Sequence, residues 1–182
     1  MSEQDVPVAV VTGAGRGIGE AVAGRLVAEG WYVVAIDRDA AGIGEFVRRV
    51  GPGRAEAAVV DVTDRAAVHD LFAQLDRRLR RIDAVVNNAM WVHYAPIADM
   101  TEEVLDGIFA IGLKAAFWTV QAARPIMARQ NDGVVINMSS PAATRGVPGK
   151  RSQASDLDRR RSHRPAHPRR RCATVLALRT RR

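Results

Sequence analysis

The sequence has one cysteine, two lysines, two tyrosines and no apolar run of the length that crosses a membrane. A membrane-spanning helix needs about 20 consecutive apolar residues, and the opening MSEQDVPVAV has acids where a signal peptide has basic residues. We therefore expect a cytoplasmic protein with no membrane partner. The single Cys172 cannot form an intramolecular disulfide and has no Cys or acidic cluster near it, so we predict no metal site.

Acidic residues become scarce only near the end of the chain. Residues 1–149 hold 15 Lys and Arg against 18 Asp and Glu, whereas residues 150–182 hold 12 against 2. The net charge thus changes from −3 to +10. The second part has no helical stripe and little to bury, which predicts one globular domain at 1–149 followed by a disordered basic tail at 150–182.

The basic run RRRSHRPAHPRRR suggests a nucleic-acid partner, because clustered arginines attract phosphate backbones. It has no interleaved aromatic residues to stack on bases, so we favour a solvated charge run over nucleic-acid binding. The abrupt change of composition also resembles out-of-frame translation of a GC-rich gene. The other two reading frames of the coding DNA past codon 150 test that hypothesis.

Short apolar runs alternate with amphipathic segments through the first 138 residues. Helical spacing of apolar residues follows each of the first four runs, and the last of these helices starts near Thr101 and is bent or ended by Pro125. Connections of this length join parallel strands, which predicts an α/β fold with a doubly wound sheet of the Rossmann type. The five expected strands are 6–11, 31–36, 55–62, 82–88 and 133–138.

A glycine-rich turn, TGAGRGIG, lies between the first strand and the first helix. Gly13, Gly17 and Gly19 let backbone N–H groups and the helix N-terminus approach a pyrophosphate, and Arg16 and Ile18 lie in the same turn. A glycine-rich turn between a strand and a helix can also serve the fold alone, without binding a ligand. Its position favours a dinucleotide site, because polar residues end the next three strands.

Asp37 ends the second strand, where a carboxylate accepts hydrogen bonds from both ribose hydroxyls and repels a 2′-phosphate. This favours NAD over NADP, although Arg16 argues mildly the other way. Asp61-Val62 ends the third strand and Asn87-Asn88-Ala89 ends the fourth.

On these motifs, residues 5–149 closely resemble the short-chain dehydrogenase/reductase family, whose TGxxxGxG turn, D-V pair and NNAG stretch correspond to them. The resemblance implies strand order 3-2-1-4-5, with the family's last strands absent, and hydride transfer between NAD(P) and an alcohol or ketone. It implies that Asp61 and Val62 flank the adenine and that Asn88 lies along the cofactor. Asp61 can instead be a turn acid or helix cap, and we expect Asn87 to tie strands together. The predicted cofactor residues are Gly13, Arg16, Gly17, Ile18, Gly19, Asp37, Asp61, Val62 and Asn88.

The resemblance places a catalytic serine at Ser140, although Ser139-Ser140 can also merely close a strand. The family moves the proton with a tyrosine whose pKa is lowered by a lysine four residues later. That YxxxK pair is expected near residue 153, where this chain reads KRSQASDLDRRR. Tyr94 is a weak substitute, because no lysine neighbours it.

Two smaller departures are Gly112, at the family's asparagine position, and Met90, at the glycine of NNAG. We therefore expect catalysis to be weakened or lost. The alternatives are a non-catalytic NAD-binding protein and an inactive truncated gene product.

The fifth strand would have an open edge, and we therefore expect the stability of the fold to be marginal. Members of the family commonly pair through the long helix, and the sequence leaves open whether two copies of this chain do so.

Overall fold

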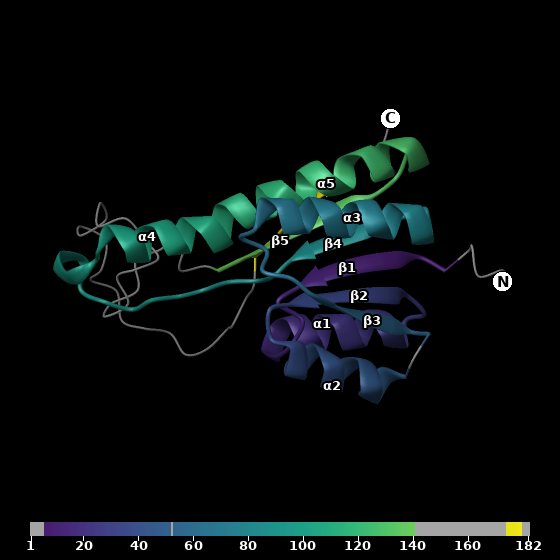
Figure 1. Cartoon of the computed structure of the whole chain (residues 1–182), viewed down its shortest axis with the longest axis horizontal. Coiled ribbons are helices and arrows are strands. Elements are labelled where there is room, and N and C mark those ends of the chain that lie inside the picture. Colours follow the sequence, from purple (N-terminus) through teal and green to yellow (C-terminus); the bar gives the residue numbers. More distant parts are fainter. Residues whose placement is uncertain (1–5, 52, 141–173, 180–182) are drawn as a thin grey trace.

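A computed structural model describes residues 6–51, 53–140 and 174–179 of the chain. Its centre is a six-stranded sheet in the order β3-β2-β1-β4-β5-β6 (Figure 1). The first five strands are parallel, so the predicted fold class and the order 3-2-1-4-5 are confirmed. The strands are β1 Val8–Thr12, β2 Tyr32–Asp37, β3 Ala55–Val59, β4 Ala84–Asn87, β5 Val134–Ser139 and β6 Thr174–Arg179.

Helices cover both faces of the sheet. Helices α1 and α2 lie on one face, and α3 and α5 lie on the other (Figure 1). The long helix runs beyond the sheet, and its protruding end is α4. The helical segments are α1 Gly17–Ala28, α2 Ala40–Val50, α3 Arg65–Leu79, η2 Ile97–Asp99, α4 Glu102–Phe109, η3 Ala110–Lys114 and α5 Ala115–Gln130.

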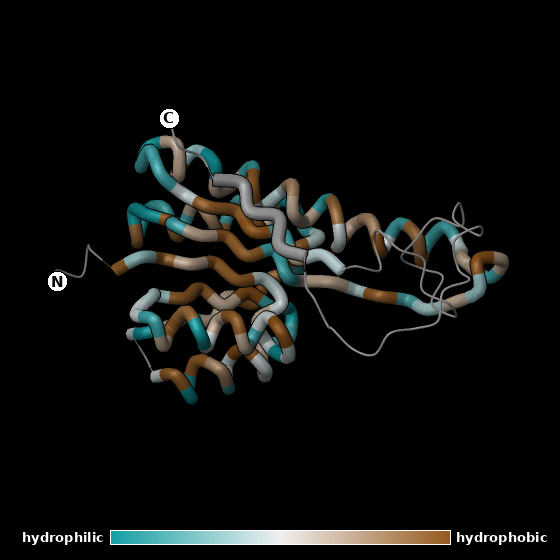
Figure 2. Tube along the Cα trace, turned by 180° about the vertical axis from the view of Figure 1, so that it is seen from behind, coloured by the Kyte–Doolittle hydropathy of each residue, from teal (hydrophilic) through white to brown (hydrophobic). Residues whose placement is uncertain are grey.

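Two apolar clusters, one on each face, hold these layers together. Successive residues of a strand point to opposite faces, so Val10 joins the cluster under α3 and α5 while Val11 joins the cluster under α1 and α2. All five residues of β1 are buried, as expected for the central strand of a parallel sheet covered on both sides. Figure 2 shows hydrophobic colour along these central strands.

Strand β6 differs from what the sequence pattern predicted. Residues 174–179 pair antiparallel with β5, from Val134 opposite Arg179 to Ser139 opposite Thr174. The predicted open edge of β5 is therefore wrong, and so is disorder for 174–179. The physical reason is that an unpaired edge offers a row of N–H and C=O groups, which the apolar run at 175–178 satisfies. Residues 150–173 and 180–182 of the predicted tail lie outside the described residues.

The expected long helix is present but contains one wider turn. Thr101 caps α4 by accepting a hydrogen bond from the Val104 N–H, and the π-helical turn η3 joins α4 to α5. Pro125 lies inside α5 and does not end it, because the helix continues to Gln130. Within the described part of the chain, none of the helices combines the length and apolar character of a membrane span.

Candidate functional site

The glycine turn after β1 packs against the end of β4 at distances that only glycine allows. A Cβ at Gly19 would lie 2.1 Å from the carbonyl oxygen of Gly13, and a Cβ at Gly13 would lie 2.9 Å from Ala89 Cα. Gly13 also has a φ of 66° and Gly17 a φ of 63°, in the left-handed region that favours glycine. A Cβ at Gly17 would meet no atom within 4 Å, so the space beside this residue is open.

Helix α1 begins without a side-chain cap. Its cap position is Arg16, which makes no capping hydrogen bond, whereas α2, α3 and α4 are capped by Asp39, Asp64 and Thr101. The first N–H groups of a helix have no partner within the helix, and they carry the positive end of its dipole. At α1 these donors remain available to an anion, and they adjoin the glycine turn.

Asp37 lies beside the same turn at the end of β2. Its Oδ2 accepts a 3.0 Å hydrogen bond from the Gly15 N–H, and its Oδ1 accepts a 3.1 Å bond from the Asp39 N–H. Each carboxylate oxygen has two lone pairs, so further acceptor capacity remains for hydroxyl groups.

Asn88 holds the turn from the β4 side. Its Nδ2 donates to the carbonyl oxygens of Thr12, at 3.0 Å, and Gly13, at 3.2 Å. The backbone N–H groups of Asn88 and Ala89 both donate to Thr12 Oγ1. The structure therefore places the Asn88 amide against the backbone of the glycine turn, where it fixes the shape of that turn.

Asp61 follows β3 and forms a local turn. Its Oδ1 accepts hydrogen bonds from the N–H and hydroxyl of Thr63, and these bonds lower the pKa of the Asp61 carboxyl, with a smaller contribution from Arg38. The turn-acid role left open by the sequence is thus present, while Asp64 caps α3. The Val62 side chain is buried in the core under α3.

A polar network that the sequence analysis did not find joins β4, β5 and α5. Asn87 Nδ2 donates to Asn137 Oδ1 at 2.8 Å, and the Thr119 hydroxyl donates to Asn87 Oδ1 at 2.8 Å. The expectation that Asn87 ties strands together agrees with these contacts. The available signal was a polar residue, Asn137, inside the apolar run GVVINM.

The predicted serine and the two tyrosines lie in different places. Ser140 directly follows β5 and is half-buried. Tyr32 is the first residue of β2, at the amino end of that strand, whereas Ser140 follows the carboxyl end of β5, and the Tyr32 hydroxyl donates to Glu56 at 3.0 Å. Burial, followed by the charge of Glu56, raises the pKa of Tyr32 to about 12, which makes it unsuitable as an acid–base group near neutral pH. Tyr94 is exposed in the segment between β4 and η2.

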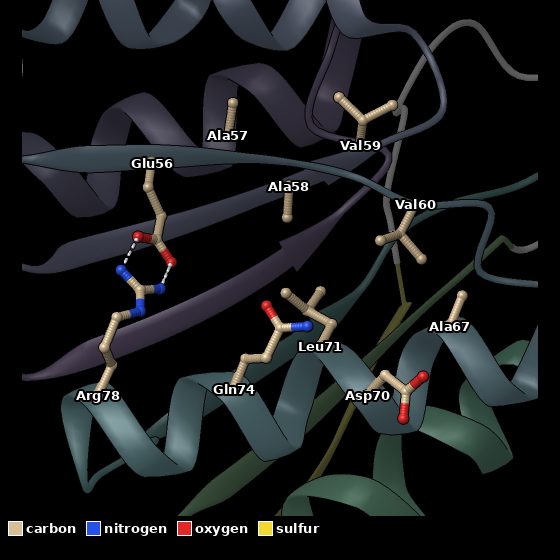
Figure 3. Close-up of a pocket in the computed structure, with 10 residues that line it drawn as sticks. All are labelled: Glu56, Ala57, Ala58, Val59, Val60, Ala67, Asp70, Leu71, Gln74 and Arg78. Atoms are coloured by element: carbon tan, nitrogen blue, oxygen red, sulfur yellow. Dashed lines mark hydrogen bonds and ion pairs between the residues drawn. The ribbon is translucent and has the colours of Figure 1, made fainter.

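A hollow of about 440 Å³ lies elsewhere, between the edge strand β3 and helix α3 (Figure 3). Glu56 and Arg78 flank it and form a two-pronged ion pair, with oxygen–nitrogen distances of 2.6 and 2.8 Å. None of the predicted cofactor residues lines this hollow. In the part of the chain that the structure describes, no three His, Cys, Asp or Glu side chains gather where they would hold a metal ion.

Comparisons with known proteins agree with this geometry. A sequence model described as "short chain dehydrogenase" matches residues 7–154. Galactitol 2-dehydrogenase of Agrobacterium fabrum is 39% identical over 140 residues, covering 76% of this chain and 54% of the relative. Sorbitol dehydrogenase of Cereibacter sphaeroides is 38% identical over 143 residues, covering 78% of this chain and 56% of the relative. The chain thus spans about half the length of these curated relatives.

Solved structures show the same likeness. A short-chain dehydrogenase from Streptomyces avermitilis has a TM-score of 0.75 and 31% identity, covering 80% of this chain and 53% of that one. A metagenomic short-chain oxidoreductase in complex with NADP has a TM-score of 0.74 and 33% identity, covering 80% and 67%.

Proposed function

Because this chain belongs to the short-chain dehydrogenase family of oxidoreductases, we propose that it binds NAD(H) at the glycine turn and transfers hydride slowly. The observation that carries the proposal is the uncapped N-terminus of α1 beside a turn whose glycines admit no Cβ at positions 13 and 19. Such a site holds a pyrophosphate through backbone N–H groups.

The described residues fit a dinucleotide. Gly13, Gly17 and Gly19 shape the turn, Arg16 and Ile18 lie at the start of α1, and Asp37 has acceptor capacity for the ribose hydroxyls. Asp61 and Val62 follow β3 and would flank the adenine. Asn88 supports the site by holding Thr12 and Gly13 in place.

NAD is the proposed cofactor, because the Asp37 carboxylate stands where a 2′-phosphate would add a second negative charge. Two exposed arginines, Arg16 and Arg38, argue in the other direction. The carboxylate is the stronger argument, since hydrogen bonds to Gly15 and Asp39 hold it in a defined position, whereas no such contact fixes Arg16 as a cap.

A nicotinamide cofactor, when bound, supplies the acceptor or donor of hydride. The chain would contribute Ser140 to orient the oxygen of an alcohol or ketone substrate. No tyrosine follows Tyr94 in the sequence, and Tyr32 lies at the amino end of β2, away from the carboxyl ends of the strands. General acid–base groups typically contribute about 10²- to 10⁴-fold to rate, so little turnover is expected.

An apolar stripe on the long helix supports self-association as part of this proposal. Leu105, Phe109, Leu113 and Phe117 recur every four residues and are 45%, 46%, 50% and 59% exposed. Burial of such a stripe against a second copy would remove apolar surface from water.

The second candidate is a nucleotide-binding protein without catalysis, which the missing YxxxK pair favours. One preparation separates the two. NADH fluorescence measures binding, and NADH formation from NAD and an alcohol such as sorbitol measures turnover. Binding with turnover supports the oxidoreductase, binding without turnover supports the second candidate, and absence of binding contradicts both.

A further inference from the structure

Two adjacent asparagines at the end of β4, Asn87 and Asn88, form hydrogen bonds to the two neighbouring strands. The two neighbouring strands of β4 are β1 and β5, and each asparagine bonds to one of them. Asn88 reaches β1, where its amide donates to the carbonyls of Thr12 and Gly13, and Asn87 reaches β5, where its amide donates to Asn137. The pair therefore connects the glycine turn to the strand that leads to Ser140.

The Asn87–Asn137 bond occupies the last rung of its ladder. These residues are register partners, and they form the final pair between β4 and β5. The β4–β5 ladder has no later pair, while β5 stays paired with β6 as far as Ser139. The side-chain hydrogen bond between Asn87 and Asn137 therefore joins β4 to β5 at the end of their ladder that lies nearest the candidate site.

Thr119 completes the tie from α5. Its side chain is buried, with 1% exposed, and its hydroxyl lies 2.8 Å from Asn87 Oδ1 and 2.9 Å from the carbonyl oxygen of Ala116. The amide of Asn87 is thereby held at both ends, by Asn137 through its nitrogen and by Thr119 through its oxygen. Asn87 is half-buried, and removing one hydrogen-bond partner of such a polar group destabilises the folded protein.

We propose that Thr119 and Asn137 are positioning residues for the cofactor site, acting through Asn87 on its neighbour Asn88 and so on the glycine turn. This inference rests on the proposed NAD(H) binding. Neither residue makes a hydrogen bond to the turn, and the contacts that transmit the effect are the four just described together with the Asn87–Asn88 peptide bond.

The test compares Thr119→Val, which keeps the shape and removes the hydroxyl, with Thr119→Ser, which keeps the hydroxyl. NADH fluorescence titrations are made well below the Tm of each variant. Thr119→Val is expected to raise the Kd for NADH by up to about tenfold, the largest factor that one lost part-buried hydrogen bond of this kind is expected to produce. Thr119→Ser is expected to stay within about twofold of wild type, as a rescue by the retained hydroxyl. Asn137→Ala, which removes the other partner, is expected to weaken binding in the same direction and provides a second route if Thr119→Val does not fold.

Thr101→Val is the matched control for stability. Thr101 belongs to the same long helix and caps α4, away from the Asn87 network. Removing the Thr101 hydroxyl is expected to lower Tm, because α4 loses its cap, and to leave the affinity for NADH unchanged. Equal Kd values for wild type, Thr119→Val and Asn137→Ala would overturn the inference, and so would weaker binding by Thr101→Val in proportion to its Tm. If wild type itself binds no NADH, the proposed function fails, which is a different result from a wild type that binds and variants that bind equally well.

Discussion

The backbone N–H of Gly15 donates a 3.0 Å hydrogen bond to Oδ2 of Asp37, joining the glycine turn after β1 to the end of β2. The two residues also touch closely, since a Cβ at Gly15 would lie 3.0 Å from the same oxygen. Asp37 therefore fixes the shape of the glycine turn and also places a negative charge beside it. A substitution of Asp37 should change both the shape of the turn and the charge next to it.

Asp37→Ser is expected to shift cofactor preference toward NADPH. Removing the charge relieves repulsion of a 2′-phosphate, and about 1.4 kcal/mol, which is a factor of ten in the ratio of the two Kd values, is within the range for close surface charges. Parallel titrations with NADH and NADPH measure the ratio.

Asp39→Ala is the matched control for Asp37→Ser. Asp39 caps α2 by accepting from the N–H groups of Ala41 and Gly42, so its loss costs stability of about 1 kcal/mol. The ratio of NADH to NADPH affinity should stay as in wild type. An equal shift in both variants would contradict a specific role for Asp37.

Gly19→Ala should destabilise the fold. The added Cβ would lie 2.1 Å from the Gly13 carbonyl oxygen and 2.5 Å from Asn88 Nδ2, so the turn must move or distort. A cost of about 1–3 kcal/mol in the free energy of unfolding is expected for such overpacking. Urea denaturation followed by circular dichroism measures it.

Gly44→Ala is the contrasting change. Gly44 lies inside α2, and an added Cβ would meet only the flexible Arg48 side chain, at 3.6 Å. Alanine favours helix over glycine by about 0.5–1 kcal/mol, so this variant should gain stability. If Gly44→Ala lowered the free energy of unfolding as much as Gly19→Ala does, the close packing of the glycine turn would not explain the effect at Gly19.

Much of this arrangement follows from sequence pattern, and the remainder depends on contacts that pattern does not encode. The glycine turn and the strands ending at Asp37 and Asn87 were predicted, because each combines a local apolar run with a local stop signal. The partners of Asn87 were not, since Asn137 and Thr119 are 50 and 32 residues away and the contact exists only after β4, β5 and α5 have packed. Strand β6 was missed because a short apolar run in a basic segment predicts no partner until the edge of β5 is in view.

The Tyr32–Glu56 contact predicts a loss of stability in strong alkali. Burial and the nearby Glu56 charge raise the pKa of Tyr32 from 10.0 to about 12 in the folded state. A raised folded-state pKa gives stability that is fully present below about pH 10 and declines as pH rises toward 12, because the unfolded chain loses this proton first. Urea midpoints measured between pH 9 and about pH 12 should fall less steeply for Tyr32→Phe than for wild type. Parallel slopes for the two proteins would assign the decline to other groups.

His69→Leu is expected to stabilise the protein. His69 lies on α3, and its Nε2 is buried without a hydrogen-bond partner in the described part of the chain. An apolar side chain of similar size removes the desolvation cost of that atom, about 1 kcal/mol. Thermal denaturation near pH 7.5 measures the gain, and His93→Leu, in the loop after β4, should change stability by less than about 0.5 kcal/mol. A loss of stability in His69→Leu would indicate that packing at this position outweighs the unpaired nitrogen.

We propose that a pyrophosphate binds at the glycine turn and the uncapped start of α1. ADP-ribose contains the adenine, both riboses and the pyrophosphate of NAD without its nicotinamide, and adenosine lacks the pyrophosphate. Calorimetric titration of the wild-type chain with each compound measures this binding. We predict saturable binding of ADP-ribose that is at least about tenfold tighter than that of adenosine, whereas equal affinities, or no heat with ADP-ribose, would contradict the account.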